Sequence, residues 1–271
     1  MIPFGVSFVE FALATFIPLY VGMLLIGAMR TAGFESRYLS AFALGLLLWF
    51  LLDTLNDATQ LGVNNGYNFN LQHTGLLLMF IFGFLVIALP AGVGLLSKTT
   101  HQSGKTGRFL AALLVAIGMG FHGLAEGVQF GGLSAGTATT NVLDAIGGLG
   151  GGVAYLLHKL LEASLVMIVF IALVESERFS LRDEWKRVAL LGLAFGIPSA
   201  IGDIVGYFVE VNSTYLFALG GGAALVVALL AVRPIWGQGW KGDLTYSRYL
   251  KMMLMVLLGF LCLYGAAMFH A

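Results

Sequence analysis

The chain has 271 residues, of which 59% are hydrophobic and 10% charged, and its 14 basic residues balance 14 acidic ones. Soluble domains carry about 25% charged residues, so this composition excludes an ordinary soluble protein and indicates an integral membrane protein. The balanced charge provides no basic surface for nucleic acid. The single cysteine, Cys262, excludes internal disulfides and thiolate metal clusters.

Eight apolar runs follow one another along the chain, each about as long as the 20 residues that cross a bilayer. They cover residues 5–29, 38–59, 73–97, 108–131, 143–174, 188–210, 214–233 and 248–269. The connections between them are short, such as the polar stretch KTTHQSGKTGR at 98–108. We therefore expect an all-α integral membrane protein with eight transmembrane helices, forming a single domain over residues 1–271.

Basic residues indicate the orientation of these helices. Every lysine and arginine except Lys159 falls in the first, third, fifth or seventh connection, or in the adjoining helix ends. The opposite side, which includes residues 60–72 and 132–142, has none. Cytoplasmic loops carry the excess of Lys and Arg. We therefore expect both termini outside, and we expect the protein in the plasma membrane.

Two of the apolar helices carry the same polar pair, a histidine followed four residues later by a glutamate. His122 and Glu126 occur in GMGFHGLAEGVQFGG, and His158 and Glu162 in YLLHKLLEASLV. Residues four apart share one face of a helix, so each helix presents an imidazole beside a carboxylate. A single intramembrane histidine is usually a hydrogen-bonding group between helices. Two such pairs on consecutive helices favour a four-ligand metal or cation site over a structural polar network.

Lys159 follows the second histidine directly, at a depth where an unpaired ammonium is costly. Glu162, three residues further along the same helix, or Glu126, across the helix interface, is its expected partner. Lys159 would then stand where a second cation would sit and neutralise the shared carboxylates. The alternative is an ordinary structural salt bridge, and the sequence leaves both interpretations open.

Four further acidic residues, Asp53, Asp57, Asp203 and Glu210, are expected in the outward halves of the second and sixth helices. They would form an acidic approach that attracts cations from outside. Alternatively, they mark helix ends at the level of the lipid headgroups. Pro198, in FGIPSAIGD, is a candidate break in the sixth helix, and broken helices often mark transport sites.

The eight-helix plan with both termini outside, together with HGLAEG at 122–127 and HKLLEA at 158–163, resembles the Zrt/Irt-like protein (ZIP) family of divalent metal transporters. That family typically carries a His-Asn-x-Pro-Glu-Gly-like motif on helix four and a His-x-x-x-Glu motif on helix five. The resemblance implies that His122, Glu126, His158 and Glu162 form the primary metal site between these helices. It also implies alternating access, in which a bundle holding both helices moves against a scaffold of the others.

The sequence departs from the family pattern at several motif positions. Gly123 stands where the family usually has Asn and cannot ligate a metal. Lys159 stands where many members have an acidic or similar ligand, although some members carry a His-Lys pair there. A second, adjoining metal is therefore not expected. Ala125 and Leu161 replace the motif prolines, so the kinks expected of those helices need not be present.

These observations predict gradient-driven uptake of a divalent metal toward the cytoplasm by a transporter or facilitator, and not an enzyme. Zinc is the expected metal, with iron, manganese and cadmium as other candidates. Two imidazoles and two carboxylates would replace the hydration of the ion and balance its charge. GGLGGGVA lacks the Gly-Lys-Ser/Thr ending of a nucleotide-binding loop, so we do not expect ATP to drive transport. The metal and the lipid bilayer are the expected partners, no resident cofactor is expected, and a homodimer is one arrangement left open.

Other functional classes fit part of the pattern. A haem-binding membrane redox protein would use His122 and His158 as axial ligands, but would leave each following glutamate without a role. An intramembrane metallohydrolase would use the same ligands with an activated water, although no His-Glu-x-x-His motif is present. A retinal protein with Lys159 as the Schiff base is disfavoured by the count of eight helices.

Overall fold

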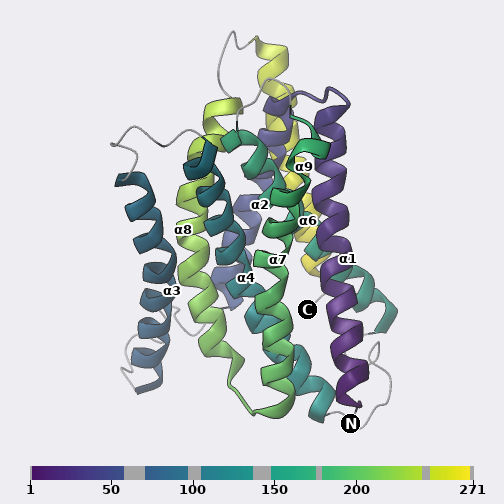
Figure 1. The fold of residues 1–271 in the computed structure, drawn as a ribbon, viewed down its shortest axis with the longest axis vertical. Coiled ribbons are helices and arrows are strands. Elements are labelled where there is room, and N and C mark those ends of the chain that lie inside the picture. The colour runs from purple at the N-terminus through teal and green to yellow at the C-terminus, as the bar shows by residue number, and fades with distance from the viewer. Residues whose placement is uncertain are drawn as a thin grey trace.

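The computed structural model describes residues 2–57, 71–96, 105–136, 148–174, 179–239 and 245–268. These residues form eight α-helices and no strands, and the helices run up and down along the long axis of the molecule (Figure 1). They are α1 (Phe4–Thr31), α2 (Ser36–Asp57), α3 (Leu71–Leu96), α4 (Lys105–Gly136), α6 (Gly148–Val174), α7 (Leu181–Phe208), α8 (Ser213–Gly239) and α9 (Tyr246–Met268). Each contains a stretch long and apolar enough to cross a membrane, which confirms the predicted all-α membrane class.

Some helices extend beyond the apolar runs that predict them. α7 begins at Leu181, where the apolar run predicts residue 188, and α8 continues to Gly239 instead of ending at 233. An apolar run marks only the part of a helix within hydrocarbon, whereas the helix itself continues into polar sequence. In α7, Arg187 donates hydrogen bonds to Glu184 Oε1 at 3.1 Å and Oε2 at 2.8 Å, one turn apart. The predicted boundaries at 59, 97, 143 and 269 lie outside the described residues.

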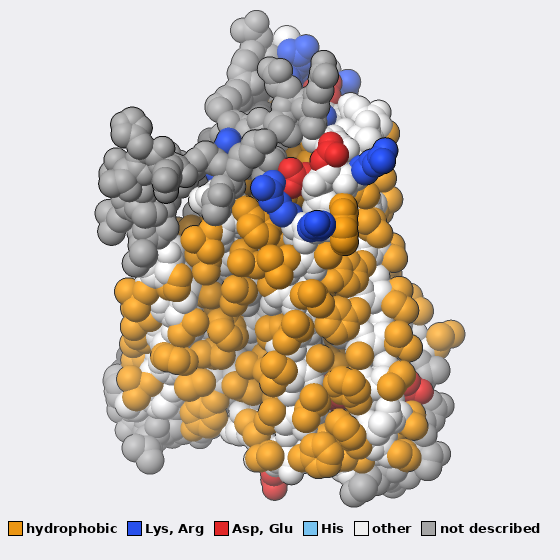
Figure 2. All heavy atoms as spheres, viewed as in Figure 1, with side chains coloured by type: hydrophobic (Ala, Val, Ile, Leu, Met, Phe, Trp, Pro, Cys, Tyr) orange, Lys and Arg blue, Asp and Glu red, His pale blue; other side chains and the backbone are white. Residues whose placement is uncertain are grey.

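Basic side chains gather at one end of the molecule. On the face shown in Figure 2, hydrophobic side chains cover the length of the helices, and Lys and Arg cluster at one end. This end contains Arg30 in the last turn of α1. Large apolar side chains that face outward include Leu89, at 63% exposure, and Leu229, also at 63%. An apolar central region with one basic end agrees with the predicted distribution of basic residues. The assignment of that end to the cytoplasm stays a prediction.

Helix α6 forms the centre of the bundle. Of its membrane-spanning window, 72% is buried, compared with 22% for α3 and for α9, which lie at the periphery. Its inner segment, including Val166, Met167 and Phe170, is fully inaccessible. Helices α1, α2, α4, α8 and α9 all contact α6. Polar residues on α6 are therefore surrounded by protein on every side.

Glycines on both partners allow three pairs of helices to approach backbone to backbone: α4 with α7, α3 with α8 and α2 with α9. A Cβ added at Gly259 of α9 would collide with the Phe42 carbonyl oxygen of α2. In return, a Cβ added at Gly45 of α2 would collide with the Val256 carbonyl oxygen of α9. Small residues at such positions give membrane helices their closest packing.

The predicted break at Pro198 is wrong, because α7 continues through it from Leu181 to Phe208. Proline removes the hydrogen bond to the carbonyl group four residues earlier, here that of Ala194. Neighbouring helices commonly compensate for such a loss within membranes. A Cβ at Gly120 of α4 would lie 3.0 Å from both Ala194 O and Pro198 Cγ. Glycine at this position lets α4 pack closely against the proline turn of α7.

The contact between α2 and α9 predicts different effects for two glycines of the same helix. Gly259→Ala should lower the melting temperature in detergent, at a cost of about 1–3 kcal/mol, because the new methyl group overpacks against α2. Gly265→Ala is the matched control, since a Cβ there meets nothing within 4 Å and alanine is the better helix former. Equal melting temperatures for the two variants would contradict the backbone contact.

Candidate metal centre

Helices α4 and α6 bring the two predicted polar pairs together in the interior of the bundle. Within α4, His122 Nε2 lies 3.5 Å from Glu126 Oε1. Within α6, His158 Nε2 lies 3.4 Å from Glu162 Oε1. The i,i+4 spacing therefore places each imidazole beside its carboxylate, as the helical period requires.

The two helices meet at Glu162. Its Oε1 atom, which is 3.4 Å from His158 Nε2, also lies 4.0 Å from His122 Nε2 on the other helix. The two imidazole rings are 6.4 Å apart between centroids and inclined by 30°. His122, His158 and Glu162 each offer one ligand atom, all within 4.8 Å of one another. Tetrahedral zinc with bonds of about 2.0 Å would place ligand atoms about 3.3 Å apart, so a small inward movement would close this group around an ion.

The group is almost completely shielded from solvent. His122 is 2% exposed, His158 4% and Glu162 0%. Glu162 Oε1 accepts no hydrogen bond from the described residues, although it faces both imidazoles. An unsatisfied carboxylate oxygen in hydrocarbon is costly. A divalent cation bound between the three side chains would satisfy it.

Lys159 pairs with the Oε2 atoms of Glu126 and Glu162, whose Oε1 atoms face the imidazoles. Its Nζ atom lies 2.6 Å from Glu162 Oε2 and forms an ion pair with Glu126 Oε2 across the helix interface. The sequence predicts Glu162 or Glu126 as the partner of Lys159, and the structure shows the ammonium paired with both. The aromatic rings of Tyr155 and Phe195 flank the ammonium, with centroids at 5.7 Å and 5.5 Å. Lys159 therefore links α4, α6 and α7 through one fully buried charge.

The five polar residues His122, Glu126, His158, Lys159 and Glu162 form one cluster. Within it, Glu126 contacts both an imidazole and the ammonium group. Its Oε1 faces His122, its Oε2 pairs with Lys159, and at 8% exposure it is the most accessible of the four predicted ligands. It lies outside the group of three whose ligand atoms converge. Glu126 as a fourth ligand stays a prediction.

Helices α2 and α8 cover the cluster with aromatic rings that sequence reasoning missed. Phe50 of α2 packs edge-on against His122 at 5.6 Å, and Phe217 of α8 lies 6.0 Å from the same ring. A Cβ at Gly220 would lie 3.1 Å from His122 Cα, so glycine there lets α8 approach. The aromatic residues carry no sequence signal that distinguishes them from ordinary core residues. The sequence places Gly220 in the small-residue stretch GGGAA but gives no sign that it contacts His122.

The predicted pathway residues occupy different places. Asp53 of α2 is partly exposed and near enough for its charge to interact with both histidines and both glutamates. Asp203 of α7 is fully buried among α1, α4 and α7, and Glu210 is exposed beyond the end of α7. The side chain of Asp57 lies outside the described residues. Asp53 is thus the pathway candidate that the fold brings beside the cluster.

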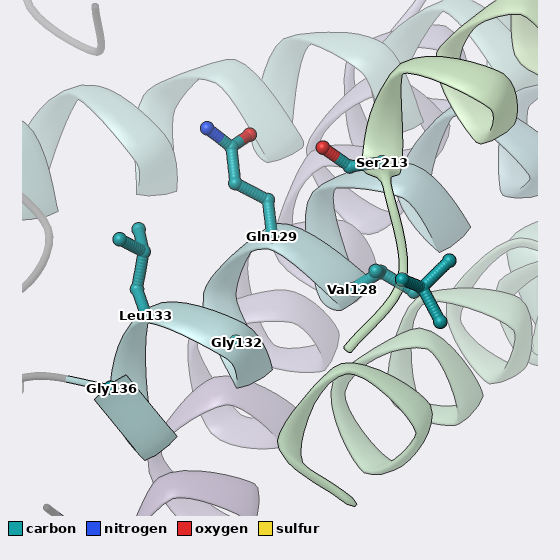
Figure 3. A pocket seen from close by; sticks show the side chains of 7 residues that line it. Val128, Gln129, Gly132, Leu133, Gly136 and Ser213 are labelled. Atoms are coloured by element: carbon teal, nitrogen blue, oxygen red, sulfur yellow. The ribbon is translucent and has the colours of Figure 1, made fainter. Parts of the chain in front are cut away.

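An open pocket of about 460 Å³ lies beyond the cluster at the C-terminal end of α4 (Figure 3). Gln129 of α4 and Ser213, the first residue of α8, are its polar lining residues and stand on facing sides of it. Gln129 lies on the same helical face as His122 and Glu126, about one turn further along α4. The predicted ligands His122 and Glu126 and the pocket residue Gln129 therefore lie along one face of α4.

Comparison of the sequence with protein-family models and with curated proteins finds no match. The case for a function rests on the chemistry of the cluster.

The geometry predicts that the two glutamates contribute unequally to metal binding. Glu162→Gln should weaken equilibrium binding of Cd²⁺ to the purified chain by about 100-fold, because it removes the charge between the two imidazoles. Glu126→Gln should weaken Cd²⁺ binding only about tenfold, since Glu126 acts partly by pairing with Lys159. Calorimetry in detergent measures both affinities. Equal losses would contradict a core of three converging ligands.

Proposed function

We propose that this protein transports divalent metal ions across a membrane, with zinc as the expected cargo, in the manner of the ZIP family that its motifs resemble. The observation that supports this proposal most strongly is the position of Glu162 Oε1, which faces His122 Nε2 and His158 Nε2 without a hydrogen bond of its own. Imidazole and carboxylate are ligands that zinc and similar ions accept. Intramembrane ionisable residues that face the bundle interior commonly mark ion pathways.

The charge of the cluster suits temporary binding. With both imidazoles in the neutral form that metal binding requires, two carboxylates and one ammonium, all almost fully buried, give one net negative charge before an ion arrives. A divalent ion would change this to one net positive charge. Without Lys159 the same ion would meet two negative charges and bind more tightly. The lysine therefore favours release, which a transporter requires as much as capture.

Helix contacts support movement of one group of helices against another. Lys159 joins α4, α6 and α7, and Thr15 of α1 shares a 3.0 Å hydrogen bond with Tyr155 of α6. Tyr20 of α1 also donates its hydroxyl to Ala189 O of α7 at 3.0 Å, so polar contacts tie α1, α4, α6 and α7 into one bundle. By contrast, α2 and α8 meet the cluster through the rings of Phe50 and Phe217. We propose that the first bundle carries the ion past α2 and α8 by alternating access, driven by the metal gradient and directed toward the cytoplasm.

The route to the cluster is proposed to pass residues that carry oxygen ligands. Asp53 supplies a partly exposed carboxylate close to the cluster. Gln129 and Ser213 supply amide and hydroxyl oxygens in the pocket at the end of α4. Because Glu126 is the most exposed of the four predicted ligands, it is the first that an arriving ion would meet.

The geometry disfavours the haem alternative. An iron bound by both histidines would lie between their Nε2 atoms, and the Glu162 carboxylate, held by Lys159, lies within 4.0 Å of both of those atoms. A planar macrocycle would have to displace this buried ion pair.

Zinc uptake into proteoliposomes tests the proposed function. Under an imposed zinc gradient without ATP, the wild-type chain should accumulate zinc, and Glu162→Gln and His158→Ala should each reduce uptake to the level of empty liposomes. Glu10→Gln is the matched control, because Glu10 is an exposed carboxylate on α1. Absence of wild-type uptake of zinc, iron, manganese and cadmium by correctly folded protein would refute the proposal.

Replacement of Lys159 tests whether this residue tunes the affinity of the cluster for metal or only forms a structural salt bridge. Lys159→Met should tighten equilibrium zinc binding by about tenfold or more, because the ion then meets two uncompensated carboxylates. The double variant Lys159→Met with Glu126→Gln restores one net negative charge and should bind zinc within a fewfold of wild type. If the single variant binds no more tightly than the double variant, Lys159 has only a structural role.

A further inference from the structure

A second buried carboxyl group lies in the same bundle, apart from the metal cluster. Asp203 of α7 has no exposed surface, and neither of its carboxyl oxygens makes a hydrogen bond within the described residues. Helix α4 packs directly onto its backbone: a Cβ at Gly127 would lie 2.8 Å from Asp203 N, and one at Gly131 would collide with Asp203 O. Asp203 thus sits at a close contact between α7 and the helix that carries His122 and Glu126.

The surroundings of Asp203 supply a hydroxyl group but no positive charge. Ser7 of α1 faces the carboxyl group, is itself fully buried, and likewise has no hydrogen bond of normal geometry. Glu10, one turn further along α1, is exposed. Tyr207, one turn further along α7, donates its hydroxyl to Ile2 O at 2.6 Å. From α4 the contacts come from glycines, so in the described part of the chain no cation pairs with Asp203.

A carboxylate ion in this setting would have neither a counter-charge nor a hydrogen-bond donor other than one hydroxyl. Buried carboxyl groups in apolar surroundings take up a proton instead of remaining charged. A neutral carboxylic acid can donate its O–H to Ser7 Oγ, which satisfies both side chains at once. Geometry and burial therefore favour a protonated Asp203.

We propose that Asp203 is a proton-binding site that exchanges its proton against the metal ion carried by the same bundle. This proposal rests on the proposed transport function. A bound divalent ion brings the metal cluster to one net positive charge, and loss of the Asp203 proton would cancel it, so that the loaded bundle crosses the membrane without net charge. The O–H bond of the acid breaks, its electron pair stays on the carboxylate, and the proton passes to water. Protons then move in the direction opposite to the metal.

Infrared spectroscopy of the purified full-length chain tests the proton site without requiring transport. The wild type should show a carbonyl band of a protonated carboxylic acid that shifts in D₂O, and Asp203→Asn should lose it. Glu10→Gln, which changes an exposed carboxylate, should keep it. Ser7→Ala retains the acid but removes its hydrogen-bond acceptor, so the band should move to higher frequency; this variant also serves if Asp203→Asn fails to fold. A band unaffected by both the Asp203 and the Ser7 changes would overturn the proposal.

Proteoliposomes with a trapped pH indicator test the coupling. In the wild type, zinc uptake should raise the pH inside the liposomes as protons leave, whereas Asp203→Asn, whose amide mimics the protonated acid, should take up zinc with proton movement reduced to the level of empty liposomes. Equal proton movement per zinc in the two proteins would overturn the coupling. If the wild type takes up no metal but the infrared band depends on Asp203, then the transport function fails and the proton site stands.

Discussion

The arrangement of the bundle depends on one buried ammonium group held between two carboxylates. Lys159 and Glu162 come from α6, and Glu126 from α4. In hydrocarbon, two carboxylates from neighbouring helices repel each other strongly unless a cation lies between them. The lysine supplies that cation permanently. It thereby joins α4 to α6 at the level where His122 and His158 face the same Glu162 oxygen.

The same lysine limits what the cluster can bind. It occupies one oxygen of each carboxylate and leaves the other oxygens to face the imidazoles. In the proposed transporter, the cluster would therefore hold one divalent ion, with Lys159 in the place that a second ion would need. The rings of Phe50 and Phe217 exclude water around His122, which strengthens every electrostatic interaction inside the cluster. For the proposed transport, this reduced charge would favour release of a divalent ion as well as its capture.

Close backbone packing joins this cluster to the rest of the bundle. Glycines of α4 allow α7 to lie against it, and the resulting contact includes the backbone of Asp203. Phe195, further along α7, flanks the Lys159 ammonium. The metal cluster and the buried acid thus share two helices that cannot shift independently without breaking these contacts. This arrangement gives a physical basis for linking the charge states of two sites in one bundle.

Local patterns in the sequence were enough to determine several features of this protein. Apolar length predicts the eight helices, and the helical period alone places His122 beside Glu126 and His158 beside Glu162. Long-range packing decided the rest. Only the tertiary structure shows that Glu162 faces both imidazoles, that Asp53 lies near the cluster while Asp203 lies apart from it, and that α7 continues through Pro198. Periodicity acts within one helix, whereas which faces meet, and at what register, depends on side chains and glycines from several helices at once.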